Sequence, residues 1–250
     1  MLNVENLEKV YKGKVSVKAL DNISLKVEKG EFIAIMGPSG SGKSTFLNTI
    51  STIDTPTAGK VYINGINPHE MKDEELSEFR RRELGFVFQQ FNLINTLTVG
   101  ENIILPLTLD YCDANSIKAK LSELSKLLGI EKILDKRTYE ISGGQAQRAA
   151  IARAVVNSPS ILLADEPTGN LDSKAAKDVM KLFKKLNEML DVTIIMVTHD
   201  PNIAAYSDRT YIIKDGRVYQ EILNRNDDKA YRHDILSTMS LLGGDEIDFV

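Results

Sequence analysis

The fold of this chain is most clearly indicated by one segment, Gly37-Pro38-Ser39-Gly40-Ser41-Gly42-Lys43-Ser44-Thr45. It follows the apolar run 32–36, which predicts a buried strand, and it leads into residues 43–52, which are compatible with a helix. In such a setting glycines let backbone N–H groups converge on phosphate oxygens, and the start of the helix favours an anion. Lys43 can supply a positive charge to the outer phosphates, and the Ser44 hydroxyl can bind Mg²⁺. Residues 37–45 therefore predict a phosphate-binding loop.

An acidic pair, Asp165-Glu166, follows a second apolar run at residues 161–164. On its own, such a pair is more often a solvated strand end. Beside a phosphate loop, however, Asp165 at the end of a buried strand can hold Mg²⁺ directly or through water. Glu166 stands one residue further out, where it can orient and partly deprotonate an attacking water. The pair therefore predicts the metal ligand and the general base of the same site.

A second glycine-containing helix start is formed by Ser142-Gly143-Gly144-Gln145, which precedes the Ala-rich stretch 146–156. Glycines and a serine at a helix N-terminus favour an anion, so this is a second candidate phosphate site. The chain has no second Lys-containing loop to go with it. A head-to-tail pair of chains solves this, with each nucleotide between the Lys43 loop of one chain and the Ser142 segment of the other.

The composition of the chain is that of an ordinary globular protein, with 250 residues, 42% hydrophobic residues and a formal charge of −4. No apolar stretch approaches the roughly 20 residues of a membrane helix, and the single cysteine excludes a disulfide framework. Residues 221–250 hold three basic and seven acidic side chains, which accounts for the whole net charge. The neutral body lacks the basic excess that binding to nucleic acid usually needs, so we expect no nucleic-acid partner.

The alternation of strand-like and helix-like segments predicts an α/β fold with a mainly parallel sheet. Residues 1–30 alternate in the manner of antiparallel strands, and no strand-like run interrupts residues 99–157, where residues 113–129 form an amphipathic helix. We therefore expect a split core (1–88 and 158–220), an inserted helical subdomain (89–157) and an acidic C-terminal extension (221–250). In the extension, one more helix is marked by Tyr231, Ile235, Met239 and Leu242. Because every motif precedes it, we expect ATP binding to survive its removal.

In order and spacing, these motifs resemble the nucleotide-binding subunits of ATP-binding-cassette (ABC) transporters over residues 1–220. The resemblance implies a P-loop NTPase (RecA-like) core with an antiparallel β subdomain and an inserted α-helical subdomain. It also implies roles for single residues: Gln89 as an Mg²⁺ ligand that senses the inserted helical domain, Glu166 as general base, His199 at the γ-phosphate, Tyr11 against adenine, and 141–145 as the signature. The segment Asn170-Leu171-Asp172 corresponds to the D-loop. The departures are small: Ile141 replaces the commoner Leu, and Gly169-Asn170 stands where many relatives have Ser-Ala.

The family resemblance further implies an ATPase that uses ATP and Mg²⁺, forms a homodimer in the ATP-bound state, and lies in the cytoplasm on the inner face of the cell membrane beside an integral membrane permease. The segments Phe-Gln-x-Phe-Asn-Leu (88–93) and Gly-Asn-Leu-Asp (169–172) resemble the macrolide-export and lipoprotein-release branch. Residues 229–249 resemble the C-terminus of ATPases of bacitracin-type peptide-resistance transporters. The alternative is a cell-division-type ATPase that regulates a membrane partner without transport. A DNA-repair ATPase would need a long heptad insertion, for which residues 99–157 are too short.

Overall fold

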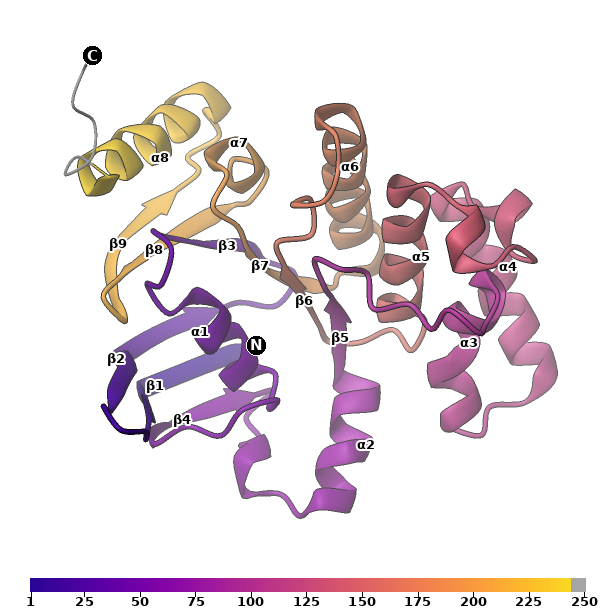
Figure 1. Ribbon diagram of the computed structural model, residues 1–250, viewed down its shortest axis with the longest axis horizontal. Coiled ribbons are helices and arrows are strands. Elements are labelled where there is room, and N and C mark those ends of the chain that lie inside the picture. Colours follow the sequence, from indigo (N-terminus) through magenta and orange to yellow (C-terminus); the bar gives the residue numbers. More distant parts are fainter. Residues whose placement is uncertain (244–250) are drawn as a thin grey trace. The chain divides into compact units, whose positions relative to one another are not determined.

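The computed structural model describes residues 1–243 and consists of two compact units. The first unit comprises Met1–Lys72 and Thr193–Val250, and the second comprises Asp73–Val192. Residues 244–250, the last part of the predicted acidic extension, lie outside the described residues. Figure 1 labels the helices and strands of both units.

The N-terminal part of the first unit is an antiparallel sheet of β1 (Leu2–Tyr11), β2 (Val17–Val27) and β4 (Ala58–Ile63), in the order β2-β1-β4. Val4 pairs with Leu25 on one side and with Val61 on the other, and all three side chains are buried. Alternating apolar residues thus share one covered face, as the period of a strand requires. The expected antiparallel β subdomain is confirmed.

The same unit contains the strands that end at the phosphate loop and at His199. Strand β3 (Phe32–Met36) runs parallel to β7 (Thr193–Val197) and to β8 (Arg209–Lys214), and β9 (Arg217–Leu223) returns antiparallel to β8. Every residue of β3 and β7 is buried, which is typical of parallel strands covered on both faces. The short helices are η1 (Pro68–Glu70), α1 (Lys43–Ile50) and α7 (Pro201–Ala204).

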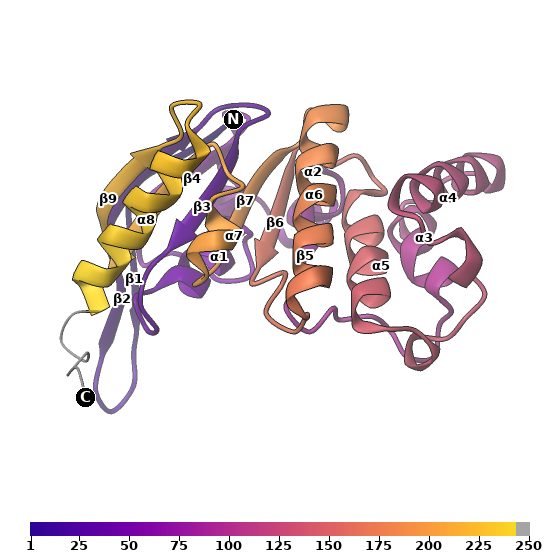
Figure 2. The same ribbon diagram turned by 90° about the horizontal axis from the view of Figure 1, so that it is seen from above.

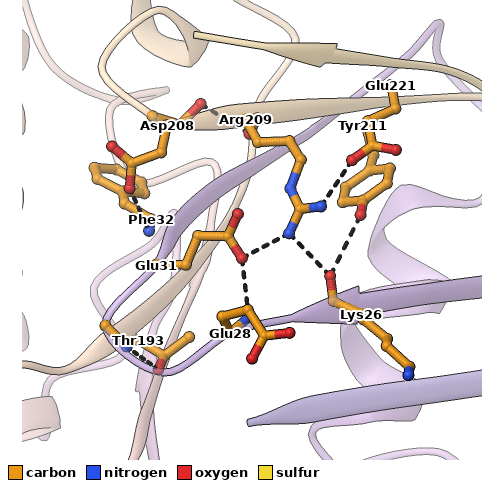
Figure 3. A network of polar contacts seen from close by, with 11 residues as sticks. Lys26, Glu28, Glu31, Phe32, Thr193, Asp208, Arg209, Tyr211 and Glu221 are labelled. Carbon is orange, nitrogen blue, oxygen red and sulfur yellow. Dashed lines mark hydrogen bonds and ion pairs between the residues drawn. The ribbon is translucent and has the colours of Figure 1, made fainter. Parts of the chain in front are cut away.

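Arg209, the first residue of β8, ties several elements of the first unit together (Figure 3). Its guanidinium donates to Glu31 at 2.6 Å, to Glu221 of β9 at 2.7 Å and to the carbonyl oxygen of Lys26 in β2 at 3.0 Å. It also lies 5.1 Å from the centre of the Tyr211 ring. The base of the β8–β9 hairpin is therefore fixed to β2 and to the turn before β3.

The C-terminal extension packs onto the first unit through α8 (Asp228–Gly243), which Figures 1 and 2 show alongside β9. Tyr231 is only 2% exposed, and its hydroxyl forms hydrogen bonds with Ser207 at 2.9 Å and with Thr210 at 2.6 Å. Burial raises the pKa of this phenol. The predicted boundary after residue 220 falls within β9 (Arg217–Leu223), so the first residues of the predicted extension complete this strand.

The second unit contains two parallel strands, β5 (Leu84–Val87) and β6 (Ile161–Asp165), and most of the helices. Its α-helices are α2 (Asp73–Glu83), α3 (Val99–Leu109), α4 (Ala114–Leu128), α5 (Gly143–Val155) and α6 (Ser173–Leu190), with the 3₁₀ turns η2 (Glu131–Ile133) and η3 (Thr138–Glu140). Helix α5 packs on α3 and β5. The amphipathic helix expected over residues 113–129 is α4, which Gly129 ends at φ +65°; the structure adds that Asp113 caps its start.

Residues 99–157 contain no strand, which agrees with the helical segment expected there. The boundaries of the two compact units, at residues 72 and 192, differ from the predicted subdomain boundaries at residues 88 and 158. The division into a split core, a helical subdomain and an extension therefore stays a prediction. Within residues 1–243 we find no helix with the length and hydropathy needed to span a bilayer.

Candidate functional site

The phosphate loop of the first unit packs so closely on neighbouring backbone that two of its glycines leave no room for a side chain. A Cβ at Gly37 would lie 2.0 Å from the carbonyl oxygen of Ile213, and one at Gly42 would lie 2.4 Å from that of Ala19. The loop leads directly into α1, whose first residue is Lys43. The Lys43 ammonium donates to the carbonyl oxygens of Gly37 at 2.9 Å and Pro38 at 2.8 Å. Two carbonyl oxygens of the loop therefore hold the Lys43 ammonium.

The loop fits a phosphate group on two observations. The Ser41 hydroxyl is buried, and its oxygen has no hydrogen-bond partner among the described residues. A buried hydroxyl without a partner is costly, so a ligand oxygen there would lower the free energy. Above Gly40, at φ +74°, a Cβ would meet nothing within 4 Å, so the backbone is open to an approaching group.

Tyr11 lies at the end of β1, where it is 43% exposed. Its hydroxyl donates to Asp54 at 2.7 Å, and the Lys9 ammonium lies 5.0 Å from the ring centre and also pairs with Asp54. Burial and the hydrogen bond to Asp54 raise the pKa of Tyr11. The ring is therefore oriented by Asp54 and partly exposed. Asp54 has no motif around it, so the sequence offered no sign of this contact.

His199 lies at the same sheet edge as the phosphate loop. Ile35 of β3 pairs with Val197 of β7 in parallel register, and Gly37 and His199 each follow two residues later. The backbone N–H of Thr198 donates to Ile35 at 3.2 Å, which continues this register beyond β7. The His199 side chain is exposed. Parallel strands therefore bring the predicted histidine to the loop edge, as expected from their shared direction.

The acidic pair of the second unit lies at the end of β6. Asp165 is the last residue of the strand, and Glu166 has a left-handed backbone with φ +44°, which is rare for a residue other than glycine. The carbonyl oxygen of Pro167, the next residue, accepts a 2.6 Å hydrogen bond from the Gln147 amide of α5. Gln147 is fully buried. This contact helps to hold the strained turn that carries Glu166.

Gln89 lies two residues beyond β5, at the same edge as Glu166, which directly follows the parallel strand β6. Its side chain packs against Gly169, where a Cβ would lie 2.7 Å from the amide nitrogen of Gln89. The Asn170 amide donates to the Gln89 carbonyl oxygen at 2.9 Å. The departure Gly169-Asn170 from the commoner Ser-Ala therefore has a physical role, because it makes room for Gln89 and then holds its backbone.

The signature segment forms the start of α5. The Ser142 hydroxyl accepts from the Gln145 N–H at 3.4 Å, and the Gln145 side chain accepts from the Ser142 N–H at 2.9 Å. This reciprocal capping box satisfies the N–H groups of Ser142 and Gln145, and the N–H groups of Gly143 and Gly144 between them are the ones that an anion at this helix start could use. A Cβ at Gly143 would come within 3.6 Å of Leu171, so the signature packs against the D-loop of its own chain.

Further along that loop, Asp172 caps α6, and its carboxylate accepts hydrogen bonds from the N–H groups of Ala175 and Lys174, which lower its pKa. The family motifs did not point to Gln147, which the structure shows as a polar side chain buried among the alanines of α5. They also gave no role to Arg153, whose guanidinium donates to the carbonyl oxygens of Phe91 and Asn92 just beyond Gln89. These contacts add to the predicted site without replacing any part of it.

A glycine-rich loop between a buried parallel strand and a helix, together with an Asp-Glu pair at the end of another parallel strand, defines the class of P-loop nucleotide hydrolases. A family profile described as ABC transporter matches residues 20–169. The chain therefore belongs to the ABC transporter family, as the ATP-binding, ATP-hydrolysing subunit.

The relatives of the chain agree along its whole length. It is 55% identical over 248 residues to the ABC transporter ATP-binding protein YxdL of Bacillus subtilis, covering 99% of this chain and 96% of YxdL. It is 46% identical over 251 residues to the bacitracin export ATP-binding protein BceA of Halalkalibacterium halodurans, covering 99% of both chains.

A solved structure of the cassette MJ0796 from Methanocaldococcus jannaschii, a dimer bound to ADP and Pi after hydrolysis, superposes with a TM-score of 0.83 at 46% identity. The match covers 90% of this chain and 99% of MJ0796. The predicted fold class is therefore confirmed.

Proposed function

We propose that this ATPase powers a membrane permease in resistance to antimicrobial peptides or in their export. The observation that carries the proposal is the 46% identity, over 99% of both chains, to a bacitracin export ATP-binding protein. The match covers 99% of this chain, so it includes the C-terminal region, where residues 229–249 carry the resemblance noted in the sequence. The protein acts at the inner face of the cell membrane, on an integral membrane partner.

In this function the phosphate loop binds the triphosphate of ATP. Backbone N–H groups of residues 37–45 and the Ser41 hydroxyl donate to phosphate oxygens, and Lys43 exchanges the carbonyl oxygens of Gly37 and Pro38 for the outer phosphates. Tyr11, oriented by Asp54, stacks on the adenine. The capping box at Ser142 supplies the second anion site to the nucleotide of a partner copy, so the ATP-bound state is a homodimer.

Hydrolysis requires a base and a group that stabilises charge at the γ-phosphate. Glu166 accepts the proton of the attacking water, and His199 donates to the γ-phosphate as charge develops there. Ser44, Gln89 and Asp165 offer a hydroxyl, an amide oxygen and a carboxylate, the hard oxygen donors that suit Mg²⁺. When bound, this ion neutralises charge on the phosphates.

A resistance assay in the host organism tests the proposal. The chromosomal gene is replaced by the Glu166→Gln variant, and growth is measured against bacitracin and against an unrelated, non-peptide antibiotic. Glu188→Gln, the same change on an exposed residue of α6, is the control. We expect Glu166→Gln alone to lose peptide resistance. Unchanged resistance, together with lost ATPase activity in the purified variant, would overturn the transport role and leave the enzyme assignment intact.

The second candidate is an ATPase that regulates a wall-remodelling partner at cell division without moving a substrate. The core motifs fit it equally well, because they report ATP hydrolysis alone. It predicts filamentous or chained cells with Glu166→Gln and no change in peptide sensitivity. Purification of the protein from native membranes in mild detergent identifies the partner: a large permease with an extracellular domain supports peptide resistance, and a four-span partner supports cell division.

A further inference from the structure

The turn between β8 and β9 lies directly against the phosphate loop. Asp215 has φ +50° and Gly216 has φ +74°, the left-handed pair of a two-residue hairpin turn. The Gly216 N–H donates to the carbonyl oxygen of Ser41 at 3.0 Å, and the Gly216 carbonyl oxygen accepts from the Asp21 N–H at 2.8 Å. One residue of the hairpin tip thus joins the phosphate loop to β2 through both of its peptide groups.

Glycines make this contact possible on both sides. The space at Gly37 is filled by the carbonyl oxygen of Ile213 in β8, and the space at Gly42 by that of Ala19 in β2. A Cβ at Gly216 would itself lie 2.8 Å from the carbonyl oxygen of Ala19. The neighbouring atoms are backbone, so a side chain could not be accommodated by rotation. The loop is therefore held between two strands at backbone distance.

Charged side chains hold the hairpin tip in place. The Arg217 guanidinium donates to Asp21 at 2.6 Å, and the Lys18 ammonium pairs with Asp21 at 2.5 Å. The other end of the same hairpin is fixed by Arg209 and Glu221, as Figure 3 shows. A hairpin held at its base and at its tip is a rigid support for the loop that it contacts.

We propose that the Asp215-Gly216 turn positions the phosphate loop for ATP. By fixing the Ser41 carbonyl oxygen, Gly216 keeps the following N–H groups of the loop in the orientation that phosphate oxygens need. A loop that is already ordered loses less conformational entropy when the nucleotide binds, so the turn raises affinity without touching ATP. Gly216 is thus a positioning residue, and this inference rests on the proposed phosphate role of residues 37–45.

The chain contains a matched control for this turn. Asn64 and Gly65, after β4, have φ +52° and +78°, so they form the same left-handed pair in the same unit. A Cβ at Gly65 would meet nothing within 4 Å. Gly65→Ala therefore carries the backbone strain of an alanine at positive φ, but it lacks the clash and the contact with the phosphate loop.

The experiment compares Gly216→Ala with Gly65→Ala in the full-length protein. ATP affinity is measured by calorimetry with Mg²⁺, turnover at saturating ATP by phosphate release, and folding by thermal melting. We expect the dissociation constant for ATP to rise about tenfold in Gly216→Ala and less than about twofold in Gly65→Ala, with turnover at saturating ATP similar in both. Equal dissociation constants in two folded variants would overturn the proposal.

A milder pair keeps the test decisive if Gly216→Ala does not fold. Arg217→Ala removes the ion pair with Asp21, and Lys214→Ala makes the same charge change on an exposed residue of the same hairpin. We expect an affinity loss of about threefold for Arg217→Ala only. Lys43→Ala is measured in parallel. If it binds ATP normally, the phosphate role itself fails; if it loses ATP while the hairpin variants match their controls, only the positioning role fails.

Discussion

The side-chain amide of Gln147 lies 2.6 Å from the carbonyl oxygen of Pro167, and both residues are buried. The contact joins α5, which begins at the signature, to the turn that carries Glu166. Among the described residues the Gln147 Oε1 has no hydrogen-bond partner, so the donation to Pro167 is the contact that holds this side chain. The signature helix and the proposed base therefore move together or lose a buried hydrogen bond.

We predict that Gln147→Leu lowers the turnover number about tenfold and leaves ATP affinity unchanged, because a displaced Glu166 affects the chemical step alone. The lost bond to a buried carbonyl also costs about 1–3 kcal/mol of stability. Asn102→Leu is the matched control, since Asn102 is a buried amide that donates to the carbonyl oxygens of Ile94 and Thr98. It should lower stability at least as much with unchanged turnover. Equal turnover in both variants would argue against the link to Glu166.

Glu166→Gln should retain ATP binding and lower hydrolysis by about 10²–10⁴-fold, because the amide cannot accept the proton of the attacking water. ATP then persists between two copies, and we expect a stable dimer in gel filtration with ATP and Mg²⁺. Glu188→Gln on the exposed surface of α6 should behave as the unmodified protein. A Glu166→Gln variant that hydrolyses ATP at the normal rate would refute the assignment of the base.

Gly169→Ser should weaken the coupling of Gln89 to nucleotide, since even the Cβ of the new side chain would lie 2.7 Å from the Gln89 amide. The end of a flexible side chain can move, so we expect a stability loss below about 1 kcal/mol. Turnover should fall more than ATP affinity. Asn170→Ala, which removes the hydrogen bond to the Gln89 carbonyl oxygen, should act in the same direction. Normal kinetics in both variants would show that Gln89 does not depend on this loop.

Deletion after residue 220 should destabilise the first unit, whereas the positions of the motifs predict that ATP binding survives in the protein that still folds. The cut falls within β9 and removes Tyr231, whose hydroxyl bonds Ser207 and Thr210. Tyr231→Phe isolates the polar part of this contact and should cost about 1 kcal/mol in chemical denaturation. Tyr219→Phe, on an exposed tyrosine, is the control. A fully stable deletion variant would restore the view of the extension as a separate module.

The pH dependence of the hairpin tip follows from Asp21. Hydrogen bonds from Lys18 and Arg217 lower the pKa of this carboxyl. Because the pKa is depressed in the folded state, the stabilisation is complete above the ordinary aspartate value of about 4 and is lost as the pH falls through the folded-state pKa. An NMR titration of the carboxyl should show this lowered value. In Arg217→Ala it should rise toward the ordinary one, and an unchanged titration would show that Arg217 has no part in it.

Much of the site could be predicted from sequence because its chemistry is local. Residues 37–45 carry the strand end, the glycine turn and the helix start within one short segment, so backbone geometry alone aims their N–H groups at phosphate. The register of parallel strands then brings His199 to the edge of Gly37, and Glu166 to that of Gln89. The alternation of strands and helices predicted that these strands are parallel, but only the structure shows that β3 lies beside β7 and β5 beside β6.

The family, the fold class and the ATPase reaction followed from the motifs in the sequence, and the residues proposed to carry the reaction were named from the same motifs. Only the tertiary structure decided what supports those residues: Gln147 beneath Pro167, Gly169 beneath Gln89, Gly216 against Ser41, and Tyr231 against Ser207. In each pair the two residues meet by packing of elements or loops, and no residue pattern marks a contact that depends on how two surfaces fit. The residues of the phosphate loop are consecutive in the sequence, so a motif can identify them. The β8–β9 hairpin that contacts the loop lies far later in the chain, at residues 209–223, and no motif connects the two.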